Sequence, residues 1–161
     1  MKEQRWRSLG AKTPPISLVV KFLESERLDT RIGACHALEK LRGRAAPAVP
    51  QLRVALQHED LWLRVRAATA LAAIGKPALL ALPDMLELIA RGPSKHDPRG
   101  MEQRFVSFAI FGKMLTRGNT KSREGVDRDK LRSAISLGLQ NQDGRARSEI
   151  SEIFGRLSYA S

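Results

Sequence analysis

The sequence predicts an all-α protein, an α-α superhelix (solenoid) of about four stacked helix pairs. Two observations lead to this fold class: a composition that favours helices and an internal repeat. Leu, Ala and Arg are the commonest residues and all three favour helices, whereas the β-branched residues typical of sheets are few. Apolar residues make up 42% of the chain and aromatic residues only 5%. The core is therefore expected to consist of closely spaced helices lined by leucine and alanine.

The internal repeat begins at Arg31 and returns at Arg64, an offset of 64 − 31 = 33 residues. Over the segments 31–41 and 64–74, arginine, alanine and leucine positions coincide. The second segment has apolar residues at 67, 70, 71 and 74, the i, i+3, i+4, i+7 pattern of an amphipathic helix. Weaker copies begin at Arg104 and Arg147 with longer spacings, so the later repeats are expected to contain insertions.

Each copy is expected to contribute two helices. First helices are predicted over 16–25, 47–58, 78–91 and 127–141, and second helices begin near the four recurrent arginines. Prolines lie at or near the starts of the first helices, where a missing N–H leaves no hydrogen bond unmade. Pro83 lies far enough inside its segment that a kink is the alternative. Glycines that follow the apolar stripes are predicted helix ends, namely Gly43, Gly75, Gly92 and Gly118.

Acidic residues precede three of the second helices. Asp29, Asp60 and Asp143 lie where a carboxylate can accept hydrogen bonds from the free N–H groups of a helix start. The third copy, which begins near Arg104, has no aspartate at the expected position. We therefore predict aspartate caps on the first, second and fourth of these helices.

The second copy resembles the HEAT repeats, in particular the short bacterial HEAT-like repeats first described in phycobilisome lyases. Residues 60–75, Asp-Leu-Trp-Leu-Arg-Val-Arg-Ala-Ala-Thr-Ala-Leu-Ala-Ala-Ile-Gly, follow the family pattern Asp-x-x-Val-Arg-x-x-Ala-Ala-x-Ala-Leu-Gly-x-Ile-Gly almost throughout. The resemblance covers roughly residues 14–160. It implies a right-handed stack whose second helices line a concave face, with structural turn pairs of Asp60 with Arg64 and of Asp143 with Arg147. The alternative is that the recurrent arginines form a basic stripe on that face.

The chain is expected to contain a basic leader, residues 1–13, and one repeat domain, residues 14–161. The predicted repeats are approximately 14–43, 44–75, 76–118 and 126–160. The last repeat ends on an apolar stripe with no helix after it, so the chain is expected to be a segment of a larger protein. Its charged N-terminus lacks the apolar stretch of a secretory signal, which is compatible with a cytoplasmic protein.

The sequence offers no residue set typical of an enzyme, a metal centre or a cofactor site. One cysteine, Cys35, cannot form an internal disulfide, and three scattered histidines do not indicate a metal site. No glycine-rich phosphate loop, Ser-His-Asp set or carboxylate pair stands out. No apolar stretch approaches the ~20 residues of a membrane span. We therefore predict a non-enzymatic protein without a cofactor and without a membrane partner.

The formal net charge of +11 bears on the partner. The preferred prediction is a scaffold that presents its concave surface to a protein or peptide, including an acidic one; the alternative is sequence-tolerant binding of a nucleic-acid phosphate backbone. The candidate binding residues on the predicted concave face are Lys40, Arg66, Lys113 and Arg156. Val106 is expected to share this face. Trp62 is predicted either to cap the seam between adjacent repeats or to contact the partner.

Overall fold

The computed structural model describes residues 14–114, 128–148, 150 and 151. The α-helices are α1 (Ile16–Leu23), α2 (Leu28–Leu41), α3 (Val49–Ala55), α4 (Leu61–Ile74), α5 (Leu82–Ala90), α6 (Met101–Phe108) and α7 (Arg128–Leu139). Residues 144–148, which follow α7, are also helical. Three other helical segments complete the described order: the 3₁₀-helices η2 (Arg42–Ala48) and η3 (Lys76–Ala81), and the π-helix η4 (Ala109–Met114), which continues α6.

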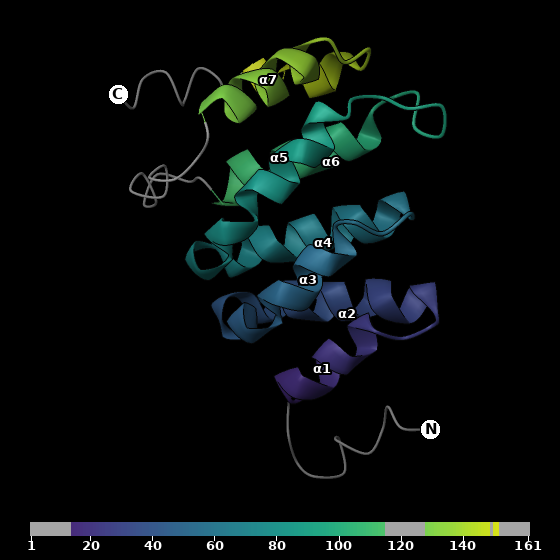
Figure 1. Cartoon of the computed structure of the whole chain (residues 1–161), viewed down its shortest axis with the longest axis vertical. Helices are drawn as coiled ribbons and strands as arrows, with labels where there is room; N and C mark the ends of the chain where they lie inside the picture. The colour runs from purple at the N-terminus through teal and green to yellow at the C-terminus, as the bar shows by residue number, and fades with distance from the viewer. Residues whose placement is uncertain (1–13, 115–127, 149, 152–161) are drawn as a thin grey trace.

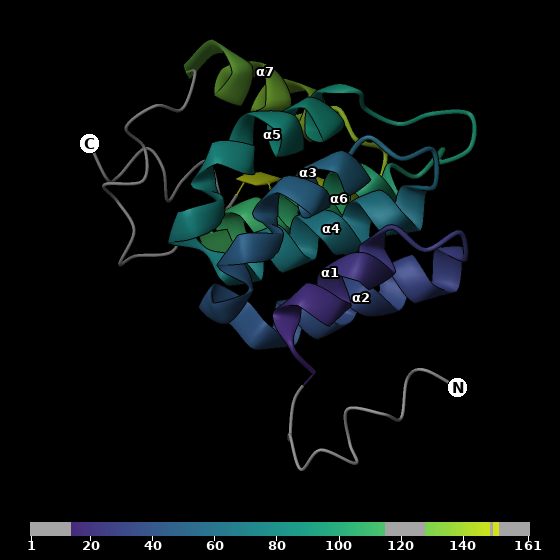
Figure 2. The ribbon, with the colours of Figure 1, turned by 60° about the horizontal axis from the view of Figure 1, so that its bottom comes forward.

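The helices stack in chain order from α1 to α7 (Figure 1). Helices α1, α3 and α5 lie in one layer and α2, α4 and α6 in a second, with each first helix against the second helix of its own pair (Figure 2). The turns within the pairs all lie at the right-hand edge of Figure 1, whereas η2 and η3 lie at the left. We call the right-hand side, formed by 24–27, 56–60, 91–100 and 140–143, the turn edge. The predicted all-α solenoid is confirmed.

Helix α4 lies at the centre of the second layer, where it contacts α2 on one side and α6 with η4 on the other. Its alanines Ala67, Ala68, Ala70 and Ala72 are buried and, being short, let the neighbouring backbones approach closely. Cys35 on α2 is completely buried in this core, and burial raises the pKa of its thiol to about 12. Cys35 is therefore a packing residue of the core.

The helix starts agree with the proline signals and only in part with the aspartate signals. Pro50 and Pro83 lie in the first turns of α3 and α5, so Pro83 begins a helix and does not kink one. Asp60 caps α4, where its Oδ1 accepts the N–H of Leu63 at 2.8 Å. Asp29 instead lies inside the first turn of α2 and makes no cap, which corrects the prediction for that helix.

The end of α2 places a non-glycine residue in a backbone region that favours glycine. Arg42, the C-cap of α2, has φ 50° and ψ −135°. The equivalent C-cap of α4, 33 residues later, has φ 76° and ψ −130° and is Gly75. A side chain in this region costs of order 1–3 kcal/mol, whereas glycine adopts it freely. Arg42 therefore stores strain that the next repeat avoids.

Replacing Arg42 with glycine is expected to raise the free energy of unfolding by about 1 kcal/mol, because the relief of strain exceeds the entropy cost of a glycine. Urea unfolding followed by circular dichroism measures the change. Arg44→Gly is the matched control, since Arg44 is also exposed but has negative φ, and this variant is expected to be less stable. A loss of stability in both variants would contradict the argument.

Candidate functional site

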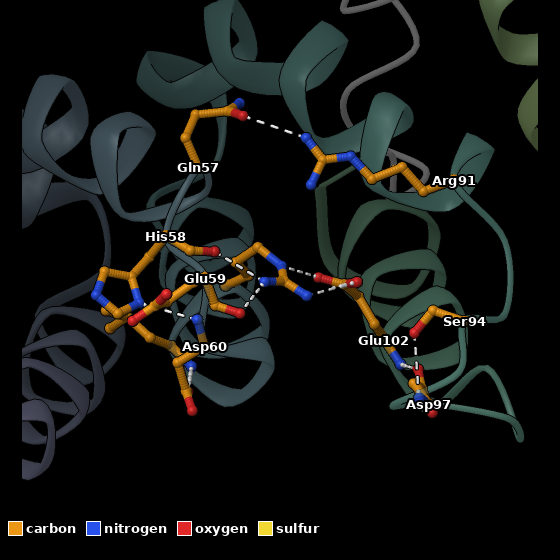
Figure 3. A network of polar contacts seen from close by, with 10 residues as sticks. Gln57, His58, Glu59, Asp60, Arg91, Ser94, Asp97 and Glu102 are labelled. Carbon is orange, nitrogen blue, oxygen red and sulfur yellow. Dashed lines mark hydrogen bonds and ion pairs between the residues drawn. The ribbon is translucent and has the colours of Figure 1, made fainter.

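The turn between α3 and α4 is closed by the guanidinium of Arg64. Its Nη1 donates to the backbone carbonyls of His58 at 2.8 Å and of Glu59 at 2.7 Å. Its Nε and Nη2 donate to the two carboxylate oxygens of Glu102, the latter bond measuring 3.0 Å (Figure 3). This two-pronged pair raises the pKa of Arg64, chiefly through the hydrogen bonds to Glu102. The side chain of Arg64 thus joins the loop between α3 and α4 to the N-terminal end of α6.

The carboxylate bound by Arg64 is therefore that of Glu102 and not that of Asp60, which corrects the predicted turn pair. The Asp60 carboxylate is turned toward the start of α4, where it caps the helix. The backbone N–H of Asp60 donates to His58 Nδ1 at 3.0 Å, which closes the turn further. Asp60 still lies near enough to Arg64 to raise the pKa of the guanidinium.

The predicted pair of Asp143 with Arg147 is replaced in the same way. Asp143 Oδ1 accepts the N–H groups of Arg145 at 2.8 Å and Ala146 at 3.4 Å, so Asp143 acts as a helix cap, as predicted. Hydrogen bonds from these N–H groups, Arg145 first, lower the pKa of Asp143. The Asp143 carboxylate forms an ion pair with Arg104 of the preceding repeat, whose Nη1 lies 3.9 Å from its Oδ2. Arg147 Nη1 donates instead to the carbonyl of Asn141 at 2.6 Å.

The recurrent arginines share one contact that the repeat offset indicates but does not reveal. Arg31, Arg64 and Arg147 each donate to the backbone carbonyl six residues earlier, on Ser25, His58 and Asn141 respectively. Buried backbone carbonyls of a tight turn need such donors. These arginines therefore fasten the turn edge, and the Glu102 carboxylate of the following repeat extends the contact of Arg64 across the seam.

The third turn lacks the expected aspartate and is closed by residues that the sequence reasoning missed. Asp97, from the inserted segment between α5 and α6, accepts the N–H groups of Met101 at 2.8 Å and Glu102 at 2.9 Å. The N–H of Asp97 donates to the hydroxyl of Ser94 (Figure 3). Asp97 thereby caps α6 and fixes the backbone of Glu102, the partner of Arg64. A run of polar and glycine residues was its only sequence signal.

The exposed side of the second layer is where the predicted binding residues lie. We define the second-helix face by the exposed residues Gly33, His36, Lys40, Trp62, Arg66, Phe108, Gly112 and Lys113. Lys40 and Arg66 make no hydrogen bond or ion pair within the described part of the chain. Lys113 is exposed but bound to Glu39 at 3.1 Å. Val106 is fully buried, which corrects its expected place, and Arg156 lies outside the described residues.

The pair of Lys113 with Glu39 also indicates the shape of this face. Lys113 lies in η4 and Glu39 in α2, so the pair crosses the intervening helix α4. The positions of α4 equivalent to these residues are Ala72 and Ala73, which are short enough to leave the path open. In a flat layer, the axes of two helices that have one helix between them are about 16–20 Å apart. A direct contact between their side chains indicates that the layer bends toward this face.

Aromatic side chains join α4 to α6 on the second-helix face. The rings of Trp62 and Phe105 are 6.0 Å apart and inclined by 56°, and the Arg104 guanidinium lies 5.9 Å from the centroid of Phe105. Trp62 is nonetheless 49% exposed and Phe108 is 51% exposed. Trp62 therefore covers the seam between two repeats, as one of the two alternatives predicts, and still offers half of its surface to a partner.

An open pocket lies on the turn edge between the first two repeats. It has a volume of about 480 Å³ and is lined by Glu26, Leu28, Arg31, His58, Glu59 and Asp60. Across residues 14–114 and the described part of 128–151, no group of three or more His, Cys, Asp or Glu side chains is placed to hold a metal ion. None of the helices in those ranges is long and apolar enough to cross a membrane.

Stacked helix pairs, fastened at their turns and joined through one continuous core, define the class of α-solenoid repeat proteins. Comparison with protein families narrows this class. The model of the HEAT repeats matches residues 16–96, half of the chain, and the chain belongs to the HEAT repeat family. No curated protein and no solved structure matches it. HEAT repeats are generally modules for protein interaction and scaffolding, and the family is typically non-enzymatic.

Proposed function

We propose that the chain is a binding module that holds an acidic segment of a partner protein against the second-helix face. The observation that carries the proposal is a combination of side chains on this one face. Lys40 and Arg66 are cations without partners among the described residues, and Trp62 and Phe108 are half-exposed aromatic rings. Arginine and tryptophan are the residues that most often dominate binding energies at protein interfaces. A bent layer also encloses a linear segment better than a flat one.

The charge of the face supports an acidic partner. The Glu39 carboxylate is engaged by Lys113 at 3.1 Å and lies 3.6 Å from His36 Nδ1, and it makes no ion pair with Lys40 or Arg66. The chain as a whole carries +11, which speeds the encounter with any anionic partner. Arg156 belongs to the same proposal as a further cation of the face.

Charge reversal tests this proposal with fluorescent poly-L-glutamate as the probe. The double variant Lys40→Glu with Arg66→Glu is expected to weaken binding by about tenfold or more at low salt. The matched control reverses Arg44 and Lys76, which are exposed in η2 and η3 at the edge opposite the turn edge, and is expected to weaken binding less. Arg156→Glu alone tests the further cation. Equal losses in the two double variants would mean that the second-helix face is not the site.

Nucleic-acid binding is a second candidate, favoured by the exposed basic residues Arg42, Arg44 and Lys76 near the connections between repeats. It predicts the opposite order of effects. Binding of random duplex DNA should weaken steeply as salt rises, and reversal of Arg44 and Lys76 should weaken it more than reversal of Lys40 and Arg66. Absence of DNA binding at low salt would eliminate this candidate.

A further inference from the structure

We infer that Trp62, Phe105 and Phe108 form an apolar subsite that takes one bulky apolar side chain of the acidic partner, with a carboxylate of the same segment held by Arg66. This inference rests on the proposed function, since it assigns the chemistry of the segment bound at the second-helix face. We call these three aromatic residues the aromatic subsite. It requires a partner segment in which an apolar side chain and an acidic one are close neighbours.

The repeat geometry places the four side chains together. Trp62 and Arg66 are four residues apart on α4, and Phe105 and Phe108 are three apart on α6, so each pair shares one side of its helix. The 6.0 Å contact between Trp62 and Phe105 joins the two helices at the seam. The aromatic subsite therefore spans the seam between α4 and α6, with Phe108 about one helical turn from Phe105 and the cation of Arg66 one helical turn from the indole.

The ring of Phe105 is held in place before any partner binds, and the ring of Phe108 lies close to the backbone of η4. Phe105 is fixed between the Trp62 ring and the Arg104 guanidinium, and that guanidinium lies 3.9 Å from the Asp143 carboxylate. The Phe108 ring lies against Gly112, where an added Cβ would meet it at 3.4 Å. Side chains that are already ordered lose less entropy on binding, which favours affinity. The rings of Trp62 and Phe108 remain about half exposed.

A peptide fits this surface better than a single-stranded nucleic acid. Aromatic rings beside an arginine can also stack with bases, but such proteins add a positively charged groove that follows the phosphate backbone. On the second-helix face, Lys40 and Arg66 are the cations without partners among the described residues, because Lys113 is bound to Glu39. Two such cations match a short acidic segment. The half-exposed rings then require an apolar side chain, which a peptide supplies.

Selection from random peptides displayed on phage tests the inference directly. The unmodified protein is expected to enrich peptides with Phe, Trp, Leu or Ile within about four residues of Asp or Glu, one helical turn. The double variant Trp62→Ser with Phe108→Ser should weaken binding of a selected synthetic peptide by about tenfold or more. In the matched control, Val54→Ser with Leu80→Ser removes exposed apolar side chains of α3 and η3 and should leave the affinity unchanged.

A fluorescence measurement covers the case in which the double variant folds poorly. Replacing Trp6 with phenylalanine leaves Trp62 as the only tryptophan, so the selected peptide should shift the emission of its indole. Phe108→Ser alone, which leaves the contact of Trp62 with Phe105 intact, should still weaken binding severalfold. Thermal melts establish that each variant is folded. An unshifted Trp62 emission on saturation would overturn the inference.

The outcomes separate the inference from the proposed function. One outcome would overturn the aromatic subsite alone. In it, the selected peptides are acidic and bind more weakly when Lys40 and Arg66 are reversed, but their affinity does not change when Trp62 and Phe108 are replaced. Peptides that respond to neither double variant would overturn both. Tighter binding of single-stranded oligothymidylate than of any selected peptide, lost with Trp62 and Phe108, would assign the rings to nucleic acid instead and overturn the inference.

Discussion

Replacing Arg64 with alanine is expected to lower the free energy of unfolding by about 3 kcal/mol, because it leaves the buried carboxylate of Glu102 without its cation. The side chains of the pair are only 13% and 11% exposed. The change also removes the donor to the carbonyls of His58 and Glu59, which close the turn before α4. Urea unfolding measures the loss of stability. The loop between α3 and α4 and the contact between α4 and α6 are expected to lose stability together, because Arg64 holds both.

Two further variants show whether the loss comes from this pair. Arg64→Lys keeps the charge but not the two-pronged geometry, so its loss should be intermediate. Arg53→Ala removes the partner of Asp84, a pair whose side chains are 42% and 25% exposed, and should cost less than about 1 kcal/mol. Similar losses for Arg53→Ala and Arg64→Ala would show that burial does not set the strength of these pairs.

The repeat pattern predicted the order and type of the helices because each copy must bury an apolar stripe against its neighbours. The apolar stripe 67, 70, 71 and 74 lies in the buried core of α4, as predicted. The boundaries were harder to predict. The segment 47–58, predicted as one helix, contains the end of η2 and then α3, which ends at Ala55. Pro47 and Pro50 both lack a backbone N–H and so cannot donate the hydrogen bonds of a continuous α-helix.

The contacts across the seams could not be predicted from one copy of the repeat. Asp60 and Arg64 are four residues apart, so a local pair was the natural expectation, but a helix start competes for the same carboxylate. Glu102 lies 38 residues after Arg64, and the insertion before α6 obscures its register. Val106 was placed by counting from Arg104, and that register does not hold on α6, where Val106 is fully buried.

The sequence indicated which residues of the second-helix face are exposed, but not which contacts they make. Lys40 and Arg66 are exposed because they lie outside the apolar stripe, which periodicity alone indicates. The engagement of Lys113 by Glu39 depends on the short alanines of α4 and on the bend of the layer, and neither follows from the helical positions of the two residues. Trp62 could be placed at a seam from its position, but its half exposure depends on the ring of Phe105 opposite.

Replacing Gly100 with alanine is expected to cost about 3 kcal/mol, through two effects that add. Gly100 occupies the N-cap position of α6 with φ 61° and ψ 42°. This is a left-handed conformation that costs alanine about 1 kcal/mol or more. An added Cβ would also lie 2.1 Å from Asn141 Nδ2, an impossible contact. Asn141 is fully buried, and its Nδ2 donates to Gln103 Oε1 at 2.7 Å and to the Gly100 carbonyl at 3.3 Å. Its displacement leaves buried polar groups unpaired.

A second glycine in the same connection separates the two effects. Gly92 has φ 67°, but an added Cβ would meet nothing within 4 Å, so Gly92→Ala should cost only the conformational part, about 1 kcal/mol. In an Asn141→Ala background, which removes the amide that the methyl group would strike, Gly100→Ala should likewise cost only about 1 kcal/mol. An undiminished loss in that background would mean that Asn141 is not the obstacle to the methyl group.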